Sequence, residues 1–231
     1  MNLDTILNVT WWSGLTLACY VGARALYRRH PHWSLMPLLT TPVMISAVLV
    51  ATRTGFAAYH AGTGWLMLML GPSVTAFAVP IYDQRSLILR CWRELLIGMT
   101  AGSVAALSSC WALASLLGVD GLLRITLMPR SISTPFAIQL SQTIGGVPEL
   151  TATFVIVTGV GGALMGEWVL ARGLVRSTLA KGTMFGVAAH AAGSAHALRL
   201  DSDVGAIAGL TMVLTGVLNL LAAPLIALVL S

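Results

Sequence analysis

Long apolar runs without a single charged residue are the feature that most restricts how this chain can fold. Six such runs occur, most of them close to the roughly 20 residues that an α-helix needs to cross a bilayer. Only 9% of the residues are charged, against about 25% in an ordinary soluble domain. Too little polar surface is left to cover a water-soluble globule, so the sequence predicts a membrane protein. The runs are Thr5 to Ala23, Trp33 to Thr52, Thr54 to Tyr82, Leu95 to Val119, Leu150 to Gly166, and Val204 to the C-terminus.

Two further segments, Ile125 to Gly146 and Gly182 to Leu198, are apolar but broken by Pro, Gly, Ser, His and Arg. With them, the sequence predicts an all-α polytopic membrane protein of about 7 to 8 membrane segments, containing an internal repeat and broken or re-entrant helices. We expect one transmembrane domain over residues 1–231. Its parts are N-terminal spans in 1–60, a first broken-helix repeat in 61–120, a second repeat in 121–172, and C-terminal spans in 173–231.

Three clusters of basic residues set the expected orientation. The positive-inside rule places all three in the cytoplasm, and the first follows the first span, so we expect the N-terminus outside. If the chain crossed the membrane three times between the second and third clusters, the third cluster would lie outside. The positive-inside rule therefore favours a re-entrant segment at Ile125 to Gly146, which leaves two crossings. Asp201 and Asp203 would then face outside, with the C-terminus in the cytoplasm. The clusters are Arg24/Arg28/Arg29, Arg85/Arg90/Arg93 and Arg172/Arg176/Lys181.

An internal repeat links two of the interrupted regions. The segment 70–79 (LGPSVTAFAV) resembles 128–138 (MPRSISTPFAI), and each is followed about 20 residues later by Glu-Leu at the start of a Gly/Ala-rich run. Interrupted apolar segments at corresponding positions of two repeats are a sequence signature of a transporter binding site.

The chemistry of these breaks fits a small carboxylate. Thr134-Pro135 has the form of an N-cap followed by Pro at the first helical position, and Pro72-Ser73 indicates a second break. The start of a half-helix offers free N–H groups and a positive partial charge. The alternative is that Pro and Gly only kink packed helices. The candidate binding residues in these motifs are Pro72, Ser73, Thr75, Arg130, Ser131, Ser133, Thr134 and Pro135.

Ionisable residues inside apolar segments extend the candidate site. His190 and His196 lie in the second broken segment, with Ser194 one helical turn after His190, and such groups usually face a cavity or a partner. We expect these three to bind the carboxylate, with His190 and Glu149 as candidates for proton coupling. Glu149 could instead pair with Arg130 or cap its helix, and Asn219 could join helices or reach the site.

Several other functions find no support in the sequence. No stretch interleaves many basic and aromatic residues, which argues against nucleic-acid binding, and no P-loop or dinucleotide fingerprint occurs. The histidine spacing and the missing carboxylate argue against a metal, and no nucleophile with a partnered base is evident. We therefore expect no enzyme activity and no cofactor.

Four motifs in order resemble the LrgB/CidB family over about residues 60–225. They are LGPSVTAFAVPIY (70–82), MPRSISTP (128–135), IGGVP (144–148) and AHAAGSAHAL (189–198). The resemblance implies a bacterial inner-membrane protein, described as a holin- or antiholin-like regulator of murein hydrolase export and autolysis. It also implies a smaller LrgA/CidA-type membrane protein as partner. Plant plastid relatives transport glycolate and glycerate, and some bacterial pairs are implicated in pyruvate uptake.

The chain departs from the family pattern at two positions. Arg130 stands where Lys is typical, which keeps the charge, and His196 stands where Arg is typical, which makes the charge pH-dependent. We therefore expect a multi-pass inner-membrane transporter of a small monocarboxylate such as glycolate, glycerate, pyruvate or lactate. Proton coupling and a homodimer both stay open. The alternative is a holin-like pore or regulator.

Overall fold

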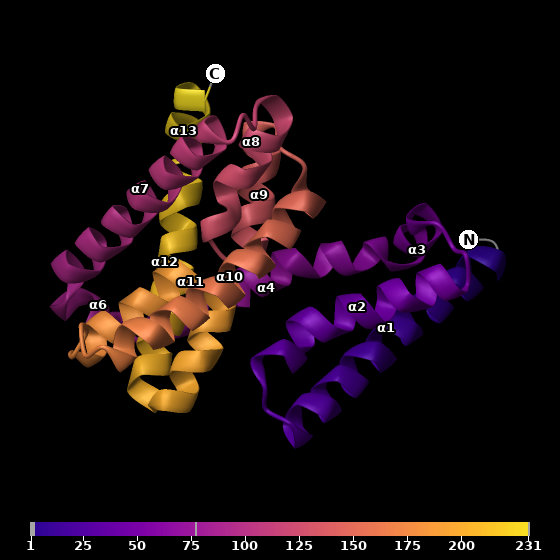
Figure 1. Ribbon diagram of the computed structural model, residues 1–231, viewed down its shortest axis with the longest axis horizontal. Helices are drawn as coiled ribbons and strands as arrows, with labels where there is room; N and C mark the ends of the chain where they lie inside the picture. The colour runs from indigo at the N-terminus through magenta and orange to yellow at the C-terminus, as the bar shows by residue number, and fades with distance from the viewer. Residues whose placement is uncertain (1–2, 77, 231) are drawn as a thin grey trace. The chain divides into compact units, whose positions relative to one another are not determined.

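The computed structural model describes residues 3–76 and 78–230, and every regular element within them is helical (Figure 1). The chain divides into two compact units, Met1–Ser73 and Val74–Ser231.

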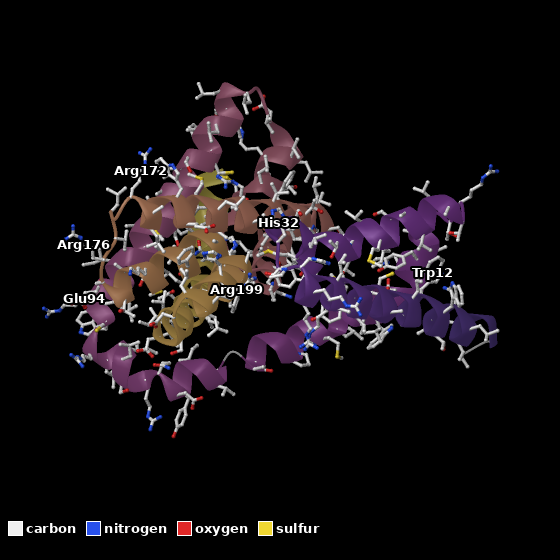
Figure 2. The ribbon with its side chains drawn as sticks, turned by 60° about the horizontal axis from the view of Figure 1, so that its bottom comes forward. Trp12, His32, Glu94, Arg172, Arg176 and Arg199 are labelled. Carbon is white, nitrogen blue, oxygen red and sulfur yellow. The ribbon has the colours of Figure 1, made fainter. Side chains whose placement is uncertain are left out.

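Unit 1 is a set of helices around the long α1, with α2 and α3 packed against it. Trp12, labelled in Figure 2, is buried and meets the Tyr59 ring edge-on, 5.7 Å between centroids. The Trp65 Nε1–H donates to Ser13 Oγ at 2.8 Å, which joins α1 to the segment after α3. The elements are α1 Leu3–Arg29, η1 Trp33–Leu35, α2 Pro37–Ala51, α3 Phe56–Thr63, η2 Gly64–Met69 and α4 Leu70–Ala76, the last of which extends across the boundary between the units.

The expected single crossing from Thr54 to Tyr82 is not one continuous α-helix. Four short helical elements, α3, η2, α4 and α5, follow one another there. A new helix begins close to the expected break at Pro72-Ser73, because Pro72 lies in the first turn of α4, which begins at Leu70. A proline is tolerated in a first helical turn because the N–H groups there have no intrahelical partner.

Unit 2 contains most of the buried residues and, among its described residues, the long helices α7, α10, α11 and α12. Three helices among the described residues are long and apolar enough to cross a membrane: α7, α10 and α12. They match three of the six expected runs, and α2 is a shorter apolar helix. The elements are α5 Ala78–Asp83, α6 Arg85–Arg90, α7 Trp92–Leu116, α8 Gly121–Leu127, η3 Met128–Ser131, α9 Thr134–Ile144, α10 Pro148–Ala171, α11 Thr178–Leu200, α12 Ser202–Leu221 and α13 Ala223–Leu230.

Glycines on α7 show how that helix runs relative to α11. A Cβ added at Gly98 would lie 3.0 Å from Thr183, and one added at Gly102 would clash with Val187. Residue numbers rise together along the two helices, so α7 runs parallel to the first part of α11.

Glycines on α10 give the opposite result. A Cβ added at Gly166 would lie 2.5 Å from the Phe185 ring, whereas one at Gly159 would lie 3.3 Å from the Ala189 carbonyl oxygen. The numbers run in opposite directions, so α10 is antiparallel to the first part of α11 and to α7. The two long helices that follow the repeated motifs therefore have inverted directions.

The start of α7 and the end of α10 consequently lie at the same end of unit 2. We call it the basic end, defined by Arg90, Arg93, Arg172 and Arg176, all of them exposed. Figure 2 shows Arg172 and Arg176 along one edge of unit 2, together with Glu94 from the first turn of α7.

Candidate functional site

Residues 121–144 form a first hairpin, because two prolines prevent one continuous helix. Pro129 is the second residue of the short 3-10 helix η3, and Pro135 lies in the first turn of α9. Between them Ile132 and Ser133 are extended. The helix N-cap is Ser133, one residue before the expected Thr134. The 11 residues of α9 rise only about 16 Å, against a hydrocarbon core of about 30 Å.

A buried hydroxyl network closes the base of this first hairpin. The Val147 N–H donates to Thr126 Oγ1 at 3.1 Å, and Thr151 Oγ1 donates to the Thr126 carbonyl at 2.8 Å. Ser141 Oγ lies 2.8 Å from Thr151 Oγ1. The end of α9 thus returns to the end of α8, and both are tied to α10. The chain enters and leaves the first hairpin at the end opposite the basic end.

A second hairpin is formed within α11, which is broken at His190. This residue has φ 46° and ψ −125°, a conformation that strains any residue except glycine. The rings of Phe185 and His196 lie 5.3 Å apart, although 11 residues of a straight helix span about 16 Å. The chain therefore doubles back at His190 into a first limb, 178–189, and a second limb, 191–200.

Glycine permits the two limbs to approach closely. A Cβ added at Gly193 would lie 2.6 Å from the Ala189 Cβ and would clash with the Phe185 carbonyl oxygen. At the base, the second limb meets α12, where a Cβ on Gly205 would lie 2.8 Å from the Leu198 Cβ. The second hairpin thus begins and ends at the basic end.

The tips of the two hairpins meet inside unit 2. The His190 ring is close to the backbone of Ser131 and within electrostatic reach of Arg130. On its other side, a Cβ added at Gly159, midway along α10, would lie 3.7 Å from His190 Nδ1. The tips therefore converge at about half the height of α10, one from each end.

Buried polar atoms without partners occur at these tips and elsewhere in the described part of unit 2. His190 is only 2% exposed, and neither of its ring nitrogens has a hydrogen bond of regular geometry. Buried polar groups are nearly always hydrogen-bonded, so each exception requires an explanation such as an absent ligand or water. The other buried atoms without a partner in unit 2 are Ser133 Oγ, His196 Nε2 and Thr215 Oγ1.

The start of α9 adds donors at the same place. Ser133 is 3% exposed and makes no side-chain capping bond, so the first N–H groups of α9 are not satisfied by their own cap. These groups carry the positive end of the helix dipole. Thr134 and Pro135 follow, half-buried in the first turn. The Arg130 guanidinium, also half-buried, lies 3.5 Å from Ser131 Oγ.

A small, mainly apolar cavity borders the first tip. It measures about 10 Å³, about the volume that one water needs, and its lining includes Ser103, Ser131 and Asn219. Asn219 Nδ2–H donates to Ser103 Oγ at 2.8 Å and to the Thr215 carbonyl at 2.8 Å. Asn219 therefore joins α12 to α7 as well as bordering the tip.

Some expected site residues lie elsewhere. Glu149 is exposed in the first turn of α10, ten residues or about 15 Å along the helix from Gly159. The salt bridge found among the described residues joins Arg124 to Asp120. Glu149 does not form one with Arg130. The expectation that Glu149 reaches the broken helices is not met by this geometry.

The first motif is divided between the units. Pro72 and Thr75 are exposed on α4 and engaged in interactions of their own. Pro72 belongs to unit 1 and Thr75 to unit 2. The side chain of Ser73 is outside the described part of the structure. No role at the tips follows for these three residues.

The break at His190 changes the expected relation between His190 and Ser194. Ser194 is on the second limb, not one turn further along a continuous helix, and its Oγ lies 4.0 Å from Met212 Sδ in α12. His196 packs on Phe185, across the hairpin.

Two residues at the tips were missed by the sequence reasoning, Ser103 as a lining residue and Thr215 as a site residue. Both are small polar residues in otherwise apolar runs, and Thr215 precedes Asn219 by one helical turn. That spacing was the available signal. Ser103 had none, because its pairing with Asn219 joins positions 116 residues apart.

Acidic side chains are remote from the tips. All seven Asp and Glu residues with described side chains are exposed. Within the described residues no group of three His, Cys, Asp or Glu side chains could hold a metal ion. The charged and titratable groups around the tips are thus cationic or imidazole.

Comparison with known proteins places nearly the whole chain in one family. The LrgB-like family model matches residues 16–229. The chain is 35% identical to the Bacillus subtilis protein YwbG over 210 residues, covering 91% of this chain and 93% of that protein. It is 30% identical to the holin-like protein CidB of Staphylococcus aureus strain Mu50 over 214 residues, covering 93% of each. YwbG is described as uncharacterized.

The Staphylococcus epidermidis holin-like protein CidB is 29% identical over 214 residues, again with 93% of each chain covered. No solved structure matches the chain. The resemblance drawn from the four sequence motifs is confirmed. The chain therefore belongs to the LrgB-like family of polytopic membrane proteins.

Proposed function

We propose that the chain is a secondary transporter of small monocarboxylates, of the glycolate, glycerate, pyruvate or lactate type. The observation that carries the proposal is the meeting of two oppositely directed hairpin tips around buried polar atoms without partners. Broken helices whose ends converge at half-height are a recurrent design for binding an anionic substrate and for alternating access.

The polar groups at the tips suit a small ligand that carries one negative charge. Arg130 supplies one cation, the His190 ring has no hydrogen bond of regular geometry, and Ser133 Oγ and Thr215 Oγ1 are buried without a partner. The start of α9 adds N–H groups, which favour a carboxylate. His190 is the coupling candidate at this place, because the buried tips contain no carboxylate among the described residues.

We further propose that six crossings and two re-entrant hairpins make up the membrane region. The crossings are α1, α2, the series α3 to α5, α7, α10, and α12 with α13. With the basic clusters in the cytoplasm, the first hairpin enters from outside and the second from the cytoplasm.

This arrangement changes the expected side of the C-terminal region. Because α11 returns to the basic end, Asp201 and Asp203 lie on the cytoplasmic side and the C-terminal residues outside, opposite to the expectation from charge counting alone. In right-side-out vesicles, an impermeant thiol reagent should leave Asp203→Cys unmodified until the membrane is permeabilised. Modification of the intact vesicles would contradict the arrangement.

A holin-like role is the second candidate, because the staphylococcal relatives carry that description. A pore does not require a saturable site, so the two candidates differ in how uptake depends on substrate concentration. An LrgA/CidA-type small membrane protein is the proposed partner in either case.

Uptake of labelled monocarboxylates into proteoliposomes decides between the two candidates. We expect saturable uptake, measured with and without a pH gradient and with and without the small partner protein. Uptake that rises linearly with concentration, or no uptake in any of these four conditions, would contradict the transporter proposal.

A further inference from the structure

The two hairpins differ in how their bases are held. In the first hairpin, Thr126, Ser141 and Thr151 are fully buried and bonded to one another and to the Val147 N–H. Thr126 Oγ1 also donates to the Leu122 carbonyl at 2.6 Å. A polar network in which every member is satisfied rigidifies its surroundings. The first hairpin is therefore anchored to α10.

The second limb of α11 lacks a comparable anchor among the described residues. Arg199, at the end of this limb, has a partner of its own. The other side-chain hydrogen bond described for the limb is the long contact from Ser194 Oγ to Met212 Sδ. Its remaining contacts are apolar: Ala197 is buried with Phe185 and with Val204 of α12.

The second limb also contacts its neighbours through glycines. At its base Leu198 lies against Gly205, and near the tip Gly193 lies against the first limb. Contacts of apolar side chains with glycine surfaces carry no directional bonds, so a segment held by them separates at lower cost than one held by a satisfied polar network.

The second limb begins at a strained residue. His190 has a positive φ, and neither of its ring nitrogens has a hydrogen bond of regular geometry. A residue held in a strained conformation at the end of an element is suited to absorb a change in φ and ψ. The first limb, in contrast, also has a polar contact with α12, because Thr211 Oγ1 donates to the Gly182 carbonyl at 3.5 Å.

We propose that the second limb of α11, residues 191–200, is the gate of the site on the basic end, while the first hairpin stays fixed to α10. Which substrate passes the gate rests on the proposed function. The motion of the second limb itself does not depend on the substrate. Opening at His190 would expose Ser194, His196 and the tips toward the basic end.

Hydrogen exchange on the full chain in nanodiscs tests the motion without any substrate. Amides of 191–200 should exchange at least about tenfold faster than those of α9. Equal protection of the second limb and α9 would overturn the gate and would leave the transport proposal untouched.

Disulfide locking tests the consequence for uptake, in a background where Cys19, Cys91 and Cys110 are replaced by Ala. The pair Leu198→Cys/Gly205→Cys joins the second limb to α12 at positions close enough for a disulfide after a small shift. Oxidation should reduce uptake by about tenfold or more, and reduction should restore it. Full uptake by the oxidised pair would overturn the gate.

The matched control is the pair Ser141→Cys/Thr151→Cys, whose side-chain oxygens lie 2.8 Å apart in the native protein. Oxidation of this pair should leave uptake within about twofold, because the first hairpin does not move against α10. Loss of uptake on oxidation of the control would also overturn the proposal. If the unmodified protein shows no uptake, the proposed function fails, and the exchange measurement alone decides the gate.

Discussion

Replacing His190 with Gly should raise the KM for uptake by about tenfold or more and leave the stability of the protein close to that of the native chain. The native φ of 46° costs a non-glycine residue about 1–3 kcal/mol, and neither buried ring nitrogen has a hydrogen bond of regular geometry. Glycine removes both penalties, and these gains offset the cost of the cavity that the buried ring leaves, so the apparent unfolding temperature in detergent should stay close to the native value. Losing one hydrogen bond to a charged ligand, about 1.5–3 kcal/mol, weakens binding by about tenfold or more.

The matched control is Arg53→Gly. Arg53 is the other non-glycine residue with a positive φ in the described part of the chain, at 54°, and it is exposed in unit 1. The Arg53→Gly variant should be at least as stable as the native chain, and its uptake should be unchanged. Native uptake by the His190→Gly variant would remove His190 from the site, and a lower unfolding temperature would show that the histidine is structural.

The second large effect is expected from Arg130→Gln. Arg130 is the cation at the first tip, within electrostatic reach of His190. Removing one partner of a desolvated charge pair costs about 2–5 kcal/mol, so kcat/KM for uptake should fall by about 30-fold or more. Arg130→Lys keeps the charge and should retain a larger share of the activity.

The control for this change is Arg124→Gln, six residues earlier in the chain. Arg124 pairs with the exposed Asp120 at the end of unit 2 opposite the basic end. Because exposed ion pairs contribute little, uptake and expression should be close to native. Equal losses in both variants would indicate a general effect of charge on this region rather than a role in binding.

Apolar runs and prolines were reliable guides in this sequence. The windows beginning at Leu95, Leu150 and Val204 lie in α7, α10 and α12, because spans are set by local composition. The break at Thr134-Pro135 was located to within one residue, since the restrictions that a proline imposes are also local.

The second hairpin could not be read from the chain in the same way. The residues around His190 are Ala and Gly with no proline, and they are compatible with a continuous helix. The reversal depends on close packing at three glycines. Gly193 packs against the first limb, Gly186 packs against α12, and Gly159 of α10 packs against the tip of the second hairpin. Such contacts leave no local pattern, and charge counting therefore assigned an extra crossing to this segment.

The site illustrates the same division between local and long-range information. Arg130, Ser133 and His190 were identifiable as polar residues in broken apolar segments, which is a local property. Glu149 was chosen because it follows the first hairpin in the sequence, but its helix directs it to the far end, exposed. Its distance from the tips depends on the direction of α10.

The most direct test of a carboxylate bound between the two tips is protection of a cysteine placed at Ser133. Ser133 Oγ is buried without a partner at the start of α9. In a Ser133→Cys variant that lacks the native cysteines and retains uptake, a small thiol reagent should modify the new cysteine. A transported monocarboxylate should slow this modification, with half-maximal protection near the KM of uptake, while its uncharged amide should not. Modification at the same rate with and without a saturating transported carboxylate would contradict the account.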